Sequence, residues 1–220
     1  MIRITAEPRL WAEVSAAWAA RLRALPAAVH PDWLLPLGPV SRNARWQDWA
    51  AFLGLGPVTA GELGDAVLRL ALLSPAQIRR ALLLRGLLMR SAQVRRCIDP
   101  STRNALVAEV GHSAWRSLTT ESSATAGPTE WLGTVDSPLP GADRLAWDGW
   151  NGFAAAPHWR AGGALVRLWR LQLPPDIPTL PLALPNPAAQ HWVLRHLAAD
   201  FKELPSWCTC AGPNWALNWV

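Results

Sequence analysis

Apolar positions along the chain recur with helical spacing, most clearly between Ser74 and Leu118. One helix is predicted from Ser74 to about Ile98, with apolar residues around most of its circumference and arginines between the apolar runs. Such a helix is buried on several sides, while long arginine stems lie along its surface and their charged heads reach water or a carboxylate. A second helix follows Asp99-Pro100 and repeats apolar residues at a spacing of four: Leu106, Val110, Ala114 and Leu118.

Residues that suit helix ends stand at most of the predicted boundaries. Ser74-Pro75-Ala76-Gln77 and Thr59-Ala60-Gly61-Glu62 have the pattern of capping boxes, in which a hydroxyl accepts from the backbone and a Gln or Glu side chain reaches back. Asp99-Pro100 and Asn186-Pro187 combine a good N-cap with a proline at the first helical position. We expect Ser41 to cap a helix to about Leu53, which Gly54 ends in a left-handed conformation.

The rest of the pattern completes a mainly α prediction. Helices are expected at about 8–25, 143–156 and 187–204, and proline-rich loops at 26–40 and 174–187 separate them from their neighbours. The stretch 164–173 fits both a helix and an alternating strand, and we interpret it as a helix. The sequence therefore predicts an irregular helical bundle with proline-rich loops and at most one short β segment in its C-terminal half.

Composition suggests how this bundle is organised. Residues 119–140 are rich in Ser, Thr, Gly and Pro, which favours a flexible connection. We therefore expect an N-terminal helical half at 1–118, a connection at 119–142 and a C-terminal helical half with a tryptophan-rich tail at 143–220, together one compact domain. Half of the 220 residues are hydrophobic and 17% are charged, which is typical of a packed globule and not of a disordered chain.

Arginine and tryptophan dominate the charged and aromatic residues. The net charge is +5 and Lys202 is the only lysine; arginine suits carboxylate-binding interfaces, although a GC-rich genome would produce the same bias. Fifteen tryptophans and no tyrosine are present. Four are expected in the core, namely Trp18, Trp46, Trp115 and Trp147. Three in the tail are expected to be exposed or docked on a partner, namely Trp207, Trp215 and Trp219.

The cysteines and the apolar runs bear on the compartment. Cys97, Cys208 and Cys210 make an odd number, and Cys97 falls in an apolar helix, so we expect free thiols and a cytosolic protein. No run of about eighteen apolar residues is present to span a membrane. Charged residues interrupt the first helix, so it does not have the pattern of a signal peptide.

A search for catalytic motifs finds no phosphate-binding loop, zinc-protease motif or nucleophile elbow. The candidate zinc ligands are His191, His196, Cys208 and Cys210, whose side chains can bind zinc. Their spacing does not match that of usual zinc sites, and the alternative is that His196 lies at the surface and the two cysteines are free thiols. Cys97, His112 and Asp99 supply the groups of a nucleophilic set, yet a thiol inside an apolar helix is expected to be inert. We predict no catalytic residue, no cofactor and no metal.

Two binding functions stay open on composition alone. A basic, aromatic chain resembles single-strand nucleic-acid binders in composition, although its arginines are scattered and no nucleic-acid-binding motif is present. The first helix also offers a membrane-surface alternative, in which Arg9, Arg21 and Arg23 meet anionic lipid while Leu10, Trp11, Val14 and Trp18 insert. Packing of that apolar face on the rest of the protein is the interpretation we prefer.

Three segments together resemble a known family. The central one is Leu83-Leu84-Arg85-Gly86-Leu87-Leu88 with Gln93-Val94-Arg95-Arg96-Cys97-Ile98 and the helix from Leu106 to Val110. Before it stands His30-Pro31-Asp32-Trp33-Leu34-Leu35-Pro36, and after it Asp148-Gly149-Trp150 through Trp169-Arg170-Leu171-Gln172-Leu173-Pro174. In order and spacing these resemble the SctK (YscK, PscK) family, an accessory component of bacterial type III secretion systems, over most of residues 30–204.

The resemblance implies a non-enzymatic adaptor of the cytoplasmic sorting platform. Such a protein bridges the cytoplasmic domain of the inner-membrane ring protein SctD and the SctQ pod, which holds SctL and the SctN ATPase, at the cytoplasmic face of the inner membrane. The resemblance supplies no contact residues. From composition and position we choose Arg79, Arg80, Arg95 and Arg96 for carboxylate pairing with a partner, and Trp207 as an anchor.

Overall fold

The computed structural model describes residues 8–36, 45–120, 138–156, 159, 162–180, 186–201, 205 and 207, which form helices and loops without a strand. The mainly α prediction is confirmed, and the ambiguous stretch 164–173 contains a helix. The elements, in chain order, are α1 (Pro8–Arg23), α2 (Leu25–Ala28), the 3-10 turn η1 (Pro31–Trp33), α3 (Trp46–Phe52), α4 (Ala60–Gly64), α5 (Ala66–Arg69), η3 (Leu70–Leu72), α6 (Pro75–Met89), α7 (Ser91–Arg95), α8 (Pro100–Val110), α9 (His112–Thr120), α10 (Ala142–Ala154), α12 (Ala164–Arg170) and α13 (Pro187–Asp200).

The chain forms two compact units, and neither is continuous in sequence. Unit 1 comprises Met1–Pro75, Gly163–Pro175 and Pro205–Val220, and unit 2 comprises Ala76–Gly162 and Asp176–Leu204. Both predicted halves, 1–118 and 143–220, contribute residues to each unit. Most of the predicted connection at 119–142 lies outside the described residues.

Unit 1 is built around α12, which packs against α5 and η3. The α12 helix buries Leu165, Leu168 and Trp169 completely, and the Trp169 indole donates to the Leu68 carbonyl over 3.4 Å. Glu62 of α4 accepts a hydrogen bond from the Leu165 backbone at 2.9 Å and thereby caps the first turn of α12. Two helices distant in sequence are therefore joined by one carboxylate.

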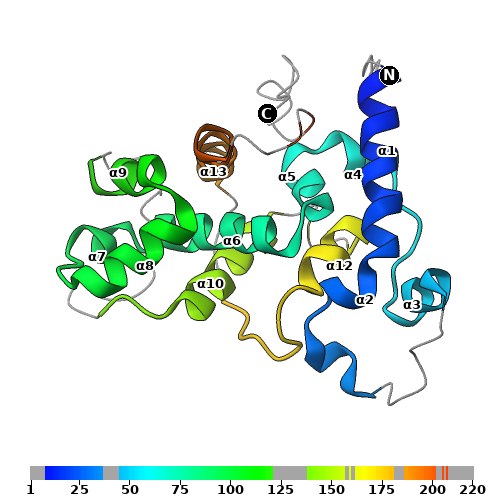
Figure 1. Cartoon of the computed structure of the whole chain (residues 1–220), viewed down its shortest axis with the longest axis horizontal. Helices are drawn as coiled ribbons and strands as arrows, with labels where there is room; N and C mark the ends of the chain where they lie inside the picture. The colour runs from blue at the N-terminus through cyan, green and yellow to red at the C-terminus, as the bar shows by residue number, and fades with distance from the viewer. Residues whose placement is uncertain are drawn as a thin grey trace. The chain divides into compact units, whose positions relative to one another are not determined.

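Unit 2 is organised around α6, whose side chains from Ala81 to Met89 are all buried. Figure 1 shows α7, α8 and α9 gathered at the end of α6 that leads into α7. The α9 helix packs against α7, α8 and α13. The predicted series at a spacing of four is confirmed as a buried stripe: Leu106, Val110, Ala114 and Leu118.

The two long helices predicted in this region are each interrupted. The first ends at Met89, and a short α7 follows after Arg90, whose backbone leaves the helical region with φ −111° and ψ 25°. The second breaks at Gly111, which has φ +93° and separates α8 from α9. A glycine adopts that conformation without the steric cost that a Cβ would add. The buried stripe nevertheless continues across the break, since Ala114 and Leu118 of α9 are buried like Leu106 and Val110 of α8.

Helices α6 and α10 cross at glycines that leave no room for a side chain. A Cβ placed on Gly86 would lie 1.9 Å from the Leu145 carbonyl oxygen, and one placed on Gly149 would lie 1.9 Å from the Leu82 carbonyl oxygen. Backbone therefore meets backbone at this crossing. Only glycine allows such an approach.

Several predicted helix ends are confirmed. The Thr59 hydroxyl accepts from the Glu62 backbone at 3.2 Å while the Glu62 carboxylate accepts from the Thr59 backbone at 3.0 Å. Asp99 and Asn186 cap α8 and α13, each followed by proline, and Gly54 has the left-handed φ of +66°. Ser41 lies outside the described residues, and α3 begins only at Trp46.

Some burial predictions are wrong. Ile98, expected in a buried helix, is 92% exposed in the loop between α7 and α8. Trp18, Trp115 and Trp147, expected in the core, are only half-buried, and the Trp46 side chain lies outside what the structure describes. Conversely Trp207, expected to be exposed or docked on a partner, is buried with 5% exposed, while Trp215 and Trp219 lie outside the described residues.

Candidate functional site

The four arginines chosen from the sequence have different surroundings in unit 2. Arg79 forms an ion pair with Asp143 of α10 at 2.9 Å. The Arg80 guanidinium lies 4.3 Å from the centre of the Phe201 ring, a cation–π contact. Arg95 and Arg96, at the end of α7, are both exposed. Arg79 and Arg80 thus contact residues of other parts of unit 2, while Arg95 and Arg96 are exposed at the end of α7.

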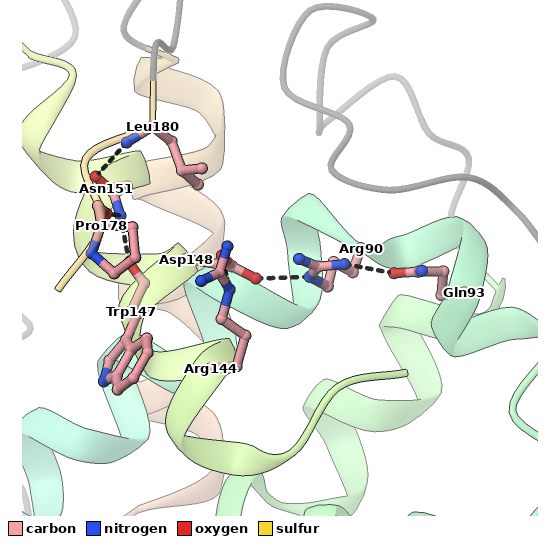
Figure 2. Close-up of polar contacts among 8 residues, drawn as sticks. All are labelled: Arg90, Gln93, Arg144, Trp147, Asp148, Asn151, Pro178 and Leu180. Carbon is pink, nitrogen blue, oxygen red and sulfur yellow. Dashed lines mark hydrogen bonds and ion pairs between the residues drawn. The ribbon is translucent and has the colours of Figure 1, made fainter. Parts of the chain in front are cut away.

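A buried carboxylate of α10 is paired with two arginines in unit 2. Asp148 of α10 is fully buried, and its two oxygens lie 2.6 Å from Arg90 Nε and 3.3 Å from Arg144 Nε. Figure 2 shows Arg90 between Asp148 and Gln93, whose side-chain oxygen accepts from Arg90 Nη1 at 3.1 Å. A buried carboxylate is stable only when it is paired and hydrogen-bonded. The cluster therefore fixes the joint between α6 and α7 against α10.

Asn151, one turn further along α10, holds an extended segment in place. Its side-chain amide donates to the carbonyls of Trp147 and Pro178, both at 2.9 Å, and its oxygen accepts from the Leu180 backbone at 3.0 Å (Figure 2). All three of these hydrogen bonds join the Asn151 amide to backbone groups. The proline-rich segment after α12 is thus fixed on unit 2 by one side chain.

Two of the motifs that carry the family resemblance meet in unit 1. The Trp33 indole donates to the Leu173 carbonyl at 2.8 Å, and the His30 backbone donates to the Leu171 carbonyl at 2.7 Å. The guanidinium groups of Arg167 and Arg170 lie 4.7 Å and 5.2 Å from the Trp33 ring centre. The carbonyls of Leu171 and Leu173, just after α12, thereby receive donors from the early loop. The motifs build one structural joint.

Two of the four candidate zinc ligands, His191 and His196, lie among the described residues. His196 is buried, which contradicts the surface alternative; its Nδ1 lies 2.9 Å from the Trp192 carbonyl and its Nε2 2.9 Å from Ser117 Oγ. His191 is exposed, and Cys208 and Cys210 lie outside the described part. Across the residues that the structure describes, no group of three or more His, Cys, Asp or Glu side chains is placed to hold a metal ion.

The nucleophilic set drawn from Cys97, His112 and Asp99 has other roles in the structure. Cys97 follows α7 in the loop, half-buried, so its predicted place inside an apolar helix is wrong. The Asp99 carboxylate accepts hydrogen bonds from the backbone of Ser101 and Thr102. Its contacts with Thr102 lower the pKa of Asp99 below its usual value. Asp99 therefore acts as a helix cap.

Helix α1 uses its apolar face internally. Val14 is buried at 2% exposed, and Leu10, Trp11 and Trp18 are half-buried. Arg21, which the membrane alternative placed at a lipid surface, is buried, and desolvation lowers its pKa to about 10. None of the described helices combines the length and the apolarity that crossing a bilayer requires.

Sequence reasoning missed the two carboxylates that organise unit 2. Asp148 shares a helical stripe with Leu145 and Gly152, and a carboxylate on an apolar stripe is a signal for a buried ion pair. Asp200, at the end of α13, accepts from the Ala114 backbone at 2.9 Å and caps α9 from outside that helix. A local sequence pattern cannot predict this cap, because Asp200 lies 86 residues after Ala114.

Comparison with known proteins identifies a family. A family model described as bacterial type III secretion protein (HrpB4) matches residues 8–204. Neither the search of curated proteins nor the search of solved structures returned a match. The matched range covers most of the chain, including the central helices and both flanking motifs. The chain therefore belongs to the HrpB4 family of bacterial type III secretion proteins.

Proposed function

We propose that the chain is a non-enzymatic adaptor of the type III secretion sorting platform. It links the cytoplasmic domain of the ring protein SctD to the SctQ pod, and through SctQ to SctL and the SctN ATPase. It acts in the bacterial cytoplasm, held at the inner membrane by protein contacts. The observation that carries the proposal is the family match over residues 8–204, taken with the resemblance to SctK proteins.

The distribution of exposed groups supports a binding role with two partners. An adaptor needs two surfaces, each with apolar anchors and a polar rim. Unit 1 exposes Leu35 and Phe52, at 73% and 52%, and unit 2 exposes Ile98 next to Arg95 and Arg96. Each unit thus offers at least one exposed large apolar side chain.

Co-purification and genetic deletion test the proposal together. The full chain, produced with SctQ and with the SctD cytoplasmic domain of the same bacterium, should co-purify with each of them and bridge the two in a three-component mixture. Deletion of its gene should abolish type III secretion, and the intact gene should restore it. Normal secretion after deletion, or binding to neither partner, would overturn the proposal.

A further inference from the structure

The loop between α7 and α8 exposes an apolar side chain to an unusual degree. Ile98 is 92% exposed, more than Leu35 or Phe52, the other large apolar residues exposed in the described part of the chain. A single exposed apolar residue is common on protein surfaces and carries no inference by itself. The rigidity and the charge around Ile98 distinguish this position.

The backbone on both sides of Ile98 is held in place. The Cys97 amide donates to the Val94 carbonyl at 3.1 Å, which ties the residue before Ile98 to the end of α7. The Asp99 carboxylate accepts from the backbone of Ser101 and Thr102 at 3.3 Å and 2.8 Å, which ties the residue after Ile98 to the start of α8. A side chain presented on a fixed backbone loses less entropy when it is bound.

Positive charge flanks Ile98 on both sides. Arg95 and Arg96 precede it, and Arg103 follows one helical turn after Asp99, whose carbonyl accepts from the Arg103 backbone at 3.1 Å. All three arginines are exposed. Asp99 is the only carboxylate in the sequence from 91 to 108, and its oxygens face the amides that begin α8. Ile98 therefore lies at a corner of the chain between exposed arginines.

We propose that this corner, formed by Arg95, Ile98 and Arg103, docks a partner protein that has an apolar pocket for Ile98 and carboxylates around the rim of that pocket. The inference rests on the proposed adaptor function and assigns one of its two surfaces. Arginine pairs with carboxylates in bidentate geometry, and an apolar anchor within a charged rim is a common interface arrangement. A nucleic-acid backbone would match the arginines but would leave Ile98 without a partner.

Binding measurements with matched variants test the docking surface. Ile98→Asp and Arg95→Glu are compared with the wild-type chain for binding to purified SctQ and, separately, to the purified SctD cytoplasmic domain. We expect each variant to bind one of these partners about tenfold or more weakly while it binds the other as the wild type does. Arg23→Glu changes an exposed arginine of α1 by the same charge, and it should bind both partners normally.

Further measurements separate the possible outcomes. Ile98→Ala removes the apolar group without adding a charge and should also weaken binding, at an unchanged melting temperature. Wild-type binding to neither partner would refute the adaptor function itself. Wild-type binding that all three corner variants retain would refute only the docking surface. Binding of a single-stranded oligothymidine that Arg95→Glu abolishes and Ile98→Ala leaves intact, with partner binding unaffected, would replace the protein partner by nucleic acid.

Discussion

Replacing Gly149 with alanine is expected to force α6 and α10 apart and to destabilise unit 2. The new Cβ would lie 1.9 Å from the Leu82 carbonyl oxygen and 3.0 Å from the Gly86 nitrogen. Ordinary contact begins at 3.4 Å, so the facing backbone must move by about 1.5 Å. Overpacking of this kind costs about 1–3 kcal/mol, and we expect the upper end because both neighbouring groups are backbone atoms that cannot rotate away.

The alanine also brings a favourable contribution that must be separated from the clash. Glycine within a helix is less favourable than alanine by about 0.5–1 kcal/mol, so the net loss should be about 2 kcal/mol. Gly64→Ala in α4 is the matched control, because nothing lies within 4 Å of its Cβ position. That variant should be neutral or slightly more stable.

Urea denaturation followed by circular dichroism measures both variants. If Gly149→Ala unfolds at the same free energy as Gly64→Ala, the proposed backbone contact between α6 and α10 is wrong. Gly86→Ala gives a second check, since its Cβ would meet the Leu145 carbonyl from the other helix. Once one alanine has separated the helices, the second should cost less, so the double variant should lose less stability than the two single changes together.

Four further changes test other parts of the structure. Asp148→Asn should destabilise unit 2 by about 3 kcal/mol in urea denaturation, because two arginines lose their charged partner in a buried site; a loss below about 1 kcal/mol would contradict this. Asp200→Ala removes the acceptor of the Ala114 amide and should cost about 1 kcal/mol, with hydrogen exchange rising first at the start of α9. Arg21→Met should raise stability at pH 7 by about 1–3 kcal/mol, because burial depresses the pKa of the Arg21 guanidinium to about 10 and the charged form is penalised in the folded state. The penalty is fully present below about pH 10 and fades as the pH rises above that value, and a less stable variant would refute this reasoning. The depressed pKa of Asp99 means that its cap stabilises α8 above the usual carboxylate range and loses this effect as pH falls through the lower folded-state value, so the stability advantage of wild type over Asp99→Ala should shrink in acid.

Local chemistry was sufficient to predict helix ends and one buried face. Thr59, Asp99 and Asn186 cap their helices through neighbours within three residues, so the sequence window contains the whole interaction. The buried stripe from Leu106 to Leu118 was also predictable, because its apolar residues keep a spacing of four on both sides of Gly111.

Features that depend on distant residues were not predictable in the same way. The break at Arg90 carries no proline or glycine, and its guanidinium binds a carboxylate 58 positions away. Ile98 was predicted to be buried and is exposed, and Trp207 was predicted to be exposed or docked on a partner and is buried. The residue type gives a preference for burial, but it does not tell which parts of the chain cover the residue. Of the candidate interface residues, the sequence could name arginines but could not tell those used internally, such as Arg79, from those left exposed, such as Arg95.

The discontinuous course of the chain limits how this protein can be dissected. The polypeptide passes from one unit to the other at 75/76, 162/163, 175/176 and 204/205, so no single cut releases an intact piece. A two-hybrid library of terminal truncations would mostly sample broken units, and loss of a signal there would report misfolding. Point substitutions on the full-length polypeptide are the sound way to map where its neighbours attach.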